Sequence, residues 1–367
     1  MAAPDIGDDQ SMRILTAILL VLIAGVSRAD TFAYVSLAKD RKIAVYKIEP
    51  STGALTHVAD IPCEGEPGAL VANPAKTALF ASLRPEGKLV AFRIDPMAGT
   101  LKHVNTVEAG PDPAQLSTDN EGRFLLAAYY VVGKVTVHAI EEGGSLRPMP
   151  VQSVSTAEKA HAILLDRDNR FAFVPHTGPN VIFQFAFNTK TGELTPGSPA
   201  RLATPEKTGP RHIVFHPRLD IAYVSNEQGG SVTAYRFDKN SGSLATMQTV
   251  STLPTSFRER NACAEIKIHS TGRFLFVSNR GHDSIARFQV DGRSGELMAL
   301  GQTPTEKTPR SFDLDPSGNL LYVCGEATNR IAAYRIDQQT GELSQTTTVS
   351  VGKTPWWITI IDLNQTQ

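Results

Sequence analysis

The chain has 367 residues, of which 41% are hydrophobic and 20% are charged, a balance typical of a protein with a buried core rather than a disordered chain. Lysine plus arginine (36) nearly cancel aspartate plus glutamate (37), so the net charge of −1 supplies no general basic field for nucleic acid or an anionic membrane. The three cysteines, Cys63, Cys263 and Cys324, are too few and too far apart for a disulfide framework or a CxxC metal site.

The first 29 residues have the parts of a secretory signal peptide. Met12-Arg13 precedes an uncharged apolar run, residues 14–26, and Ser27-Arg28-Ala29 places small residues where a signal peptidase cuts. The run would span only about 20 Å as a helix, too short for a bilayer core of about 30 Å, so we expect no membrane span. We therefore predict removal of residues 1–29 and export, periplasmic or secreted. The alternative is a frayed N-terminal helix on a cytoplasmic protein.

A Gly-x-Leu turn recurs seven times in the remaining chain, at intervals of 45 to 53 residues with a mean of 48. Before each turn, two runs rich in Val, Ile, Tyr and Phe alternate with smaller or polar residues, which is the two-residue period of strands. A further short strand precedes each pair of runs. The turn glycines are Gly53, Gly99, Gly144, Gly192, Gly242, Gly295 and Gly341.

Four antiparallel strands in about 48 residues are typical of a propeller blade. We predict an all-β fold, a seven-bladed β-propeller that forms a single domain over residues 30–365. The chain begins at Phe32 in the place of a second strand, and its missing first strand lies in residues 355–360. We expect this C-terminal strand to be innermost in the blade that residues 31–60 complete, closing the ring without free edges.

Two columns of the repeat should converge on one mouth of the central channel, at the start of the inner strands and just past the second strands. They vary in residue type instead of repeating one residue, and His, Arg and Glu concentrate in blades four to seven. The first column and its successor contain Gly68, Ala114, His161, Arg211, Ala264, Arg310 and Trp356, then Ala69, Gln115, Ala162, His212, Glu265, Ser311 and Trp357. The second column contains Ala38, Arg84, Tyr130, Thr177, Glu227, Arg280 and Glu326.

These residue types point to an anionic substrate with an electrophilic centre. Arginines are forked donors for carboxylate or phosphate, and a carboxylate beside an imidazole can activate water. There is no Gly-x-Ser-x-Gly elbow, and Cys263 has no obvious paired base, which disfavours covalent catalysis. We expect neither a metal nor a cofactor. Structural alternatives remain: Arg211 and Arg280 could pair with Glu227 and Glu265 to hold blades together.

Other residues near these columns also have structural interpretations. His161 could be a satisfied buried histidine, and His212 and His216 fit structural roles better than catalytic ones. Trp356 and Trp357 fit packing of the closing strand, although one of them could cover a sugar face.

Four segments, GPRHIVFHP with AYVSNE, ACAEIKIHSTGRFLFVSNRGHDSI, TPRSFDLDPSGNLLYV and VGKTPWW, resemble the 6-phosphogluconolactonase family of seven-bladed propellers. This family is similar to the fungal enzymes that lactonise carboxymuconate. The resemblance extends from about Phe32 to Ile361. It implies a site of His161, Arg211, Glu227 and Arg280, and the segments LRPEG and TPRSF around Arg84 and Arg310 also look like family segments.

The resemblance implies a metal-independent lactonase, a carboxylic ester hydrolase of carbohydrate metabolism that opens 6-phosphogluconolactone to 6-phosphogluconate. Arg211 and Arg280 would hold anionic charge, Glu227 and His161 would handle the proton, and Arg84, Arg310 and Glu265 would contact the substrate. We expect a monomer with a small anionic lactone as its ligand. Because the family's pathway enzyme is cytosolic, the predicted export leaves a changed substrate open. The other hypotheses are a non-catalytic exported propeller that binds a partner or glycan, and a muconate-type lactonising enzyme.

Overall fold

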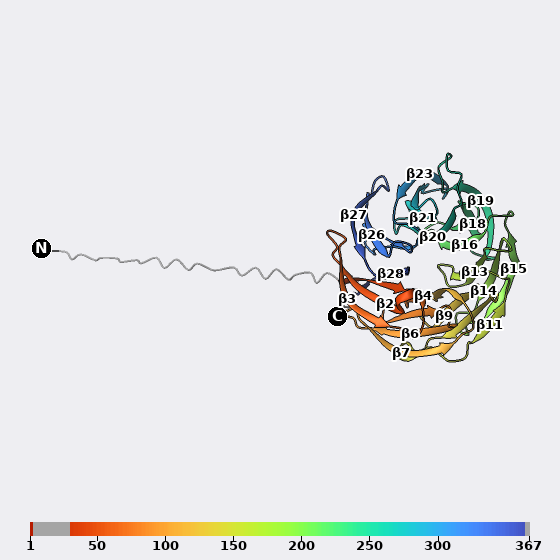
Figure 1. Ribbon diagram of the computed structural model, residues 1–367, viewed down its shortest axis with the longest axis horizontal. Coiled ribbons are helices and arrows are strands. Elements are labelled where there is room, and N and C mark those ends of the chain that lie inside the picture. The colour runs from red at the N-terminus through yellow and green to blue at the C-terminus, as the bar shows by residue number, and fades with distance from the viewer. Residues whose placement is uncertain (3–29, 364–367) are drawn as a thin grey trace.

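In the computed structural model, which describes residues 1–2 and 30–363, seven four-stranded antiparallel sheets form a ring (Figure 1). The predicted all-β seven-bladed propeller is confirmed. Most of the predicted signal peptide, residues 3–29, lies outside the described residues, and so do residues 364–367. No helix among the described residues is long and apolar enough to cross a membrane.

Each blade orders its strands from the channel outward. Blades one to three contain β28 (Pro355–Leu363), β1 (Asp30–Leu37), β2 (Lys42–Ile48) and β3 (Leu55–Pro62); β4 (Pro67–Ala72), β5 (Ala78–Leu83), β6 (Lys88–Ile94) and β7 (Leu101–Glu108); and β8 (Pro113–Thr118), β9 (Phe124–Tyr129), β10 (Lys134–Ala139) and β11 (Gln152–Ser155). Blade four contains β12 (Leu164–Leu165), β13 (Phe171–His176), β14 (Val181–Phe187) and β15 (Leu194–Ala203).

Blades five to seven contain β16 (Pro210–Phe215), β17 (Ile221–Asn226), β18 (Ser231–Asp238) and β19 (Ser243–Ser251); β20 (Ala262–Ile268), β21 (Phe274–Arg280), β22 (Ser284–Val290) and β23 (Leu297–Pro304); and β24 (Pro309–Leu314), β25 (Leu320–Gly325), β26 (Arg330–Ile336) and β27 (Leu343–Ser350). Two short 3₁₀ turns, η1 (Ala38–Asp40) and η2 (Glu142–Gly144), lie in loops.

The ring closes as the sequence predicts. Strand β28 pairs antiparallel with β1, with Tyr34 opposite Thr359 and Phe32 opposite Ile361. In this sheet β28 is the first strand of the order β28-β1-β2-β3, so the C-terminal segment is innermost in the blade that the N-terminal segment completes.

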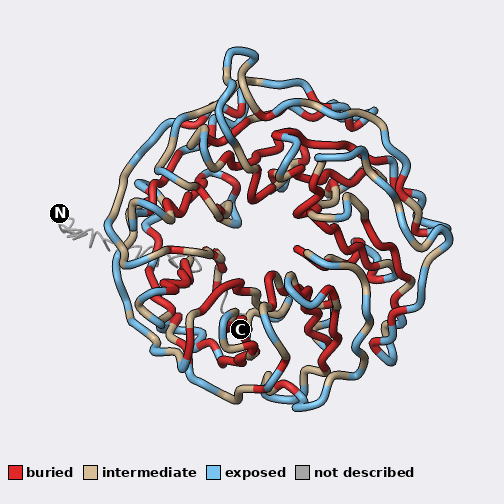
Figure 2. Tube along the Cα trace, turned by 45° about the vertical axis from the view of Figure 1, so that its right-hand side comes forward, coloured by how far each residue is buried: buried red, intermediate tan, exposed pale blue. Residues whose placement is uncertain are grey.

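The blades bury their middle strands and expose their outer ones (Figure 2). Every residue of β5 and of β17 is buried, whereas the outer strands β3 and β27 consist mainly of exposed and partly buried residues. The apolar core therefore lies within and between the blades.

The seven turn glycines pack each blade against the blade before it. All seven have φ between +67° and +85°, and a Cβ added at any of them would lie 2.1 to 3.1 Å from a residue at or near the start of the second strand of the preceding blade. Gly341, for example, lies against the Phe274 ring, and Gly99 lies against Phe32 and also accepts a hydrogen bond from the Tyr34 hydroxyl at 2.8 Å. The motif that marks the repeat is thus also the contact that joins the blades.

Candidate active site at the mouth of the central channel

A β-bulge sets three residues of the first predicted column apart from the strand pairing. Pro210 lies opposite Asn226 and His212 opposite Ser225, so Arg211 between them has no partner on β17. The same shift leaves Arg310 unpaired on β24 and Trp356 unpaired on β28. A bulge residue leaves the pleat and re-aims its side chain, so these side chains do not have to follow the alternation between the two faces of the sheet.

Glu227 joins the two central arginines. Its Oε2 lies 3.0 Å from Nε of Arg211 and 3.3 Å from Nη2 of Arg280. The Arg211 residue is only 1% exposed, whereas the side chain of Glu227 retains 24% and that of Arg280 16%. Part of the ion network of the structural alternative is therefore present, since both arginines pair with Glu227. The Glu227 carboxylate is nevertheless partly open to solvent.

His161 lies beside this ion network. Its imidazole is buried, its Nδ1 has no hydrogen-bond partner among the described residues, and its backbone N–H donates to Pro175 at 3.0 Å. Its ring makes edge contacts with Tyr130 and His212, with centroids 5.5 and 5.1 Å apart. Burial, and next the positive charge of Arg211, hold the pKa of His161 well below 6.5, so the ring is neutral at pH 7.

A second group of cations surrounds Trp356. The guanidinium carbons of Arg84 and Arg310 lie over its indole, 5.4 and 4.5 Å from the centroid. Arg84 is paired with Asp112 at 2.6 Å, and Arg310 lies 3.6 Å from Glu326.

Burial and the neighbouring guanidiniums lower the pKa of Arg310 to about 9 and that of Arg211 to about 10. Both arginines remain charged at pH 7, and a bound anion would relieve their mutual repulsion.

Glu265, expected to contact substrate, faces His212 instead. The residue is only 4% exposed, and its Oε1 lies 3.0 Å from Nδ1 of His212. His212, expected to be structural, lies against Arg211 and His161 and therefore borders the site. The two residues hold equivalent positions in neighbouring blades, which is the one sequence signal that could have suggested their pairing.

Groups at the other end of the inner strands are structural. The Nε2 of His216 lies 3.1 Å from the carbonyl oxygen of Gly272, and that of His269 lies 2.9 Å from the carbonyl oxygen of Gly318, so each histidine bonds the turn of the next blade. Arg218 donates to the Thr271 carbonyl in the same region.

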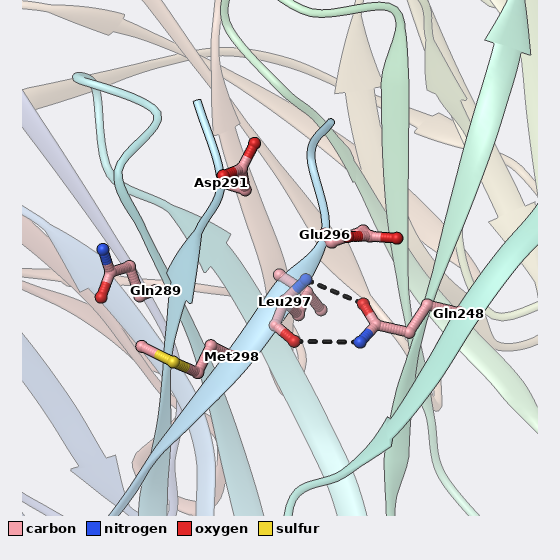
Figure 3. Close-up of a pocket in the computed structure, with 6 residues that line it drawn as sticks. All are labelled: Gln248, Gln289, Asp291, Glu296, Leu297 and Met298. Atoms are coloured by element: carbon pink, nitrogen blue, oxygen red, sulfur yellow. Dashed lines mark hydrogen bonds between the residues drawn. The ribbon is translucent and has the colours of Figure 1, made fainter. Parts of the chain in front are cut away.

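An open depression on the outer rim is also structural in character (Figure 3). The Gln248 side-chain amide accepts from the N–H of Leu297 at 2.8 Å and donates to its carbonyl at 3.0 Å, which clasps blade five to blade six. Gln152 clasps Leu194 in the same way. Because this repeated pair of hydrogen bonds explains Gln248 as a link between blades, we place the candidate site instead where Arg211, Glu227 and Arg280 come together.

The described residues contain no group of three or more His, Cys, Asp or Glu side chains arranged to hold a metal ion. Burial raises the pKa of Cys263 to about 11, so its thiol is not ionised at pH 7.

The model of a family described as "Lactonase, 7-bladed beta-propeller" matches residues 25–360. The chain is 33% identical to a 6-phosphogluconolactonase of Pectobacterium carotovorum over 67% of this chain and 74% of that protein. It is 32% identical to one from an Enterobacter species over 80% and 73% of the two chains. A solved structure described as a periplasmic gluconolactonase of Pseudomonas aeruginosa is 25% identical, with a TM-score of 0.85 over 92% of this chain and 100% of that one.

Proposed function

Because this chain belongs to the lactonase family of seven-bladed β-propellers, whose members act on lactones, we propose that it hydrolyses the δ-lactone of a sugar acid, specifically 6-phosphogluconolactone to 6-phosphogluconate. The observation that carries the proposal is that Arg211 and Arg280 meet at Glu227, with His161 nearby against His212. Two further arginines, Arg84 and Arg310, lie over Trp356.

The chemistry requires a base for water and a donor for the leaving alkoxide. His161 is neutral and its Nδ1 is buried without a partner, so in this proposal the other ring nitrogen, Nε2, takes a proton from water and returns it to the ring oxygen as the acyl C–O bond breaks. Glu227, shared by two guanidiniums and open to solvent, orients the water and the two arginines. The remaining N–H groups of Arg211 and Arg280 stabilise the oxyanion.

The group around Trp356 is suited to the far end of the substrate. An indole face can pack against a sugar ring, and the guanidiniums of Arg84 and Arg310 are forked donors for a phosphate. In this assignment the phosphate binds at Arg84 and Arg310 while the lactone carbonyl lies between Arg211 and Arg280.

A second candidate substrate is the unphosphorylated lactone. The apolar run at residues 14–26 and the Ser27-Arg28-Ala29 site favour an exported protein, where a phosphorylated pathway sugar is not expected. The relative from Pseudomonas aeruginosa described as a periplasmic gluconolactonase supports this alternative. N-terminal sequencing of the native protein tests export: a chain that starts near Asp30 is expected, and one that retains Met1 or Met12 refutes it.

The test of function measures ring opening of 6-phosphoglucono-δ-lactone and glucono-δ-lactone by purified protein, each corrected for spontaneous hydrolysis. We expect a higher kcat/KM for the phosphorylated lactone, and we expect Arg310→Ala to remove that preference. Equal activity on both would move the assignment to the unphosphorylated lactone, and turnover of neither would refute the lactonase. Activity that survives dialysis against EDTA would support metal independence, whereas loss with recovery on adding Zn²⁺ or Ca²⁺ would refute it.

A further inference from the structure

We propose that His212 and Glu265 form a positioning pair that holds the guanidinium of Arg211 in the orientation the reaction needs. This inference rests on the proposed function, because it assigns the pair a role in that reaction. Neither residue is a direct contact of the substrate in this proposal.

The pair has a defined protonation pattern. Burial alone would raise the pKa of Glu265, but His212 and Lys267 lower it to about 2, so the carboxylate is ionised and can only accept. Burial and Arg211 lower the pKa of His212 to about 4, so its ring is neutral. The proton of the neutral ring must then lie on Nδ1, which donates to Oε1 of Glu265 at 3.0 Å.

The imidazole of His212 contacts the guanidinium of Arg211. Nη1 of Arg211 lies 3.2 Å from Nε2 and 3.4 Å from Nδ1 of His212, and two nearly equal distances place it over the ring rather than along one lone pair. Guanidinium groups stack on aromatic faces in this way. A carboxylate on Nδ1 makes the ring richer in electrons, so Glu265 strengthens the attraction between the ring and the guanidinium.

The burial of these three residues makes the arrangement rigid. Arg211, His212 and Glu265 are 1%, 3% and 4% exposed, whereas the side chain of Glu227, which pairs with Nε of the same guanidinium, is 24% exposed. His212 also contacts His161 and Trp357, with ring centroids 5.1 and 5.9 Å apart. Arg211 is thus held between a buried platform and the solvent-facing carboxylate of Glu227, and only its remaining donors can turn to an anion.

The kinetic test is a double-mutant cycle between Glu265→Gln and Arg211→Ala. We expect Glu265→Gln to lower kcat roughly 10- to 100-fold with a smaller change in KM, because a slightly misplaced guanidinium costs most in the transition state. In the Arg211→Ala background the same change should cost less than about twofold, since Glu265 acts through Arg211. Equal losses in both backgrounds would overturn the proposal, as would a lower melting temperature with unchanged kcat.

The matched control is Asp166→Asn. Asp166 is also a buried carboxylate, 1% exposed, but it lies in the turn after β12, where its Oδ1 accepts from the N–H groups of Arg170 at 2.6 Å and Phe171 at 2.7 Å. In the described hydrogen bonds and ion pairs it contacts none of the four central site residues and neither Glu265 nor Lys267. Its effect on kcat should be small and additive with Arg211→Ala. A coupling as large as that of Glu265 would show a general effect of removing a buried carboxylate and overturn the specific pairing.

A measurement that needs no turnover separates this inference from the proposed function. ¹⁵N chemical shifts of the His212 ring should show Nδ1 protonated and Nε2 unprotonated in the native protein at pH 7, and Glu265→Gln should shift this tautomer balance toward Nε2–H. An Nε2–H tautomer in the native protein would overturn the pair. A native protein with the expected tautomer but without lactone turnover would refute the proposed function and the role in catalysis, and leave the geometry of the pair standing.

Discussion

The seven turn glycines predict a large and specific cost for a single added methyl group, and Gly341 offers the sharpest case. Gly341 has φ +70°, and a Cβ built on it would lie 2.6 Å from Cδ1 of the Phe274 ring in the preceding blade. Phe274 is 2% exposed, so its ring has no solvent to move into. The substitution Gly341→Ala therefore combines a strained backbone with an overfilled contact between blades.

The two costs can be added. A left-handed backbone costs an L-residue about 1–2 kcal/mol, and extra carbon in a packed core costs about 1–3 kcal/mol. The free energy of unfolding should thus fall by about 2–5 kcal/mol, a large part of the roughly 5–15 kcal/mol typical of a folded domain. Gly292 is the matched control, because its added Cβ meets nothing within 4 Å and its φ is not in the left-handed region. Gly292→Ala should be neutral or slightly stabilising.

Urea unfolding followed by tryptophan fluorescence and by circular dichroism would measure both variants. The Gly341→Ala midpoint should fall clearly below that of the native protein, while the Gly292→Ala midpoint stays close to it. If the two variants unfold alike, the contact between turn and preceding blade does not stabilise the ring, and the explanation given for the repeated glycine is wrong.

Three further predictions concern closure, the site and pH. A chain that ends at Thr354 loses β28 with the buried side chains of Ile358, Ile360, Ile361 and Leu363, worth about 6–12 kcal/mol, and should not fold; native-like melting would contradict the closure argument. Arg280→Ala should lower kcat/KM roughly 10²–10³-fold. In the control Arg218→Ala, at the opposite end of the inner strands, kcat/KM should stay near the native value. A lower melting temperature of Arg280→Ala with unchanged kinetics would show that Arg280 has only a structural role. Burial lowers the pKa of His176 and His212 to about 4, so between about pH 6.5 and pH 4 these histidines bind protons in the unfolded chain but not in the folded one. Stability should be full above about pH 6.5 and fall as the pH drops toward 4, by up to about 3 kcal/mol per histidine, and His212→Gln should flatten part of that fall in thermal melts.

The fold was accessible from the sequence because each blade is one repeat. The spacing of the Gly-x-Leu turns marks the blade boundaries, and the alternation within runs such as residues 221–226 marks the buried strands. Closure was accessible too, because a chain that begins in the place of a second strand must find its first strand at its other end.

Which side chains pair with one another inside the site was harder to predict from the sequence. The columns singled out Arg211, Glu227 and Arg280, and in the structure Glu227 pairs with both arginines. They could not show that Glu265 faces His212, because an unseen bulge sets where each side chain of the inner strand points. Which arginines can still bind a ligand depends on which carboxylates they pair with. Such pairing requires distances of about 3 to 4 Å, and a pattern of residue types does not give distances.

The bulge also explains how a symmetric ring carries an asymmetric site. The unpaired position holds a small residue in blade three, Ala114, and a large charged or aromatic one at Arg211, Arg310 and Trp356, yet the flanking pairs keep the same register. Its side chain does not follow the alternation of the pleat, so residues that differ in size and charge can occupy this position. The seven turn glycines, by contrast, must stay glycine because each is packed against the preceding blade. Stability and chemistry thus depend on different positions of the same repeat, and an arginine cluster can gather on one side of the mouth while the blades remain alike.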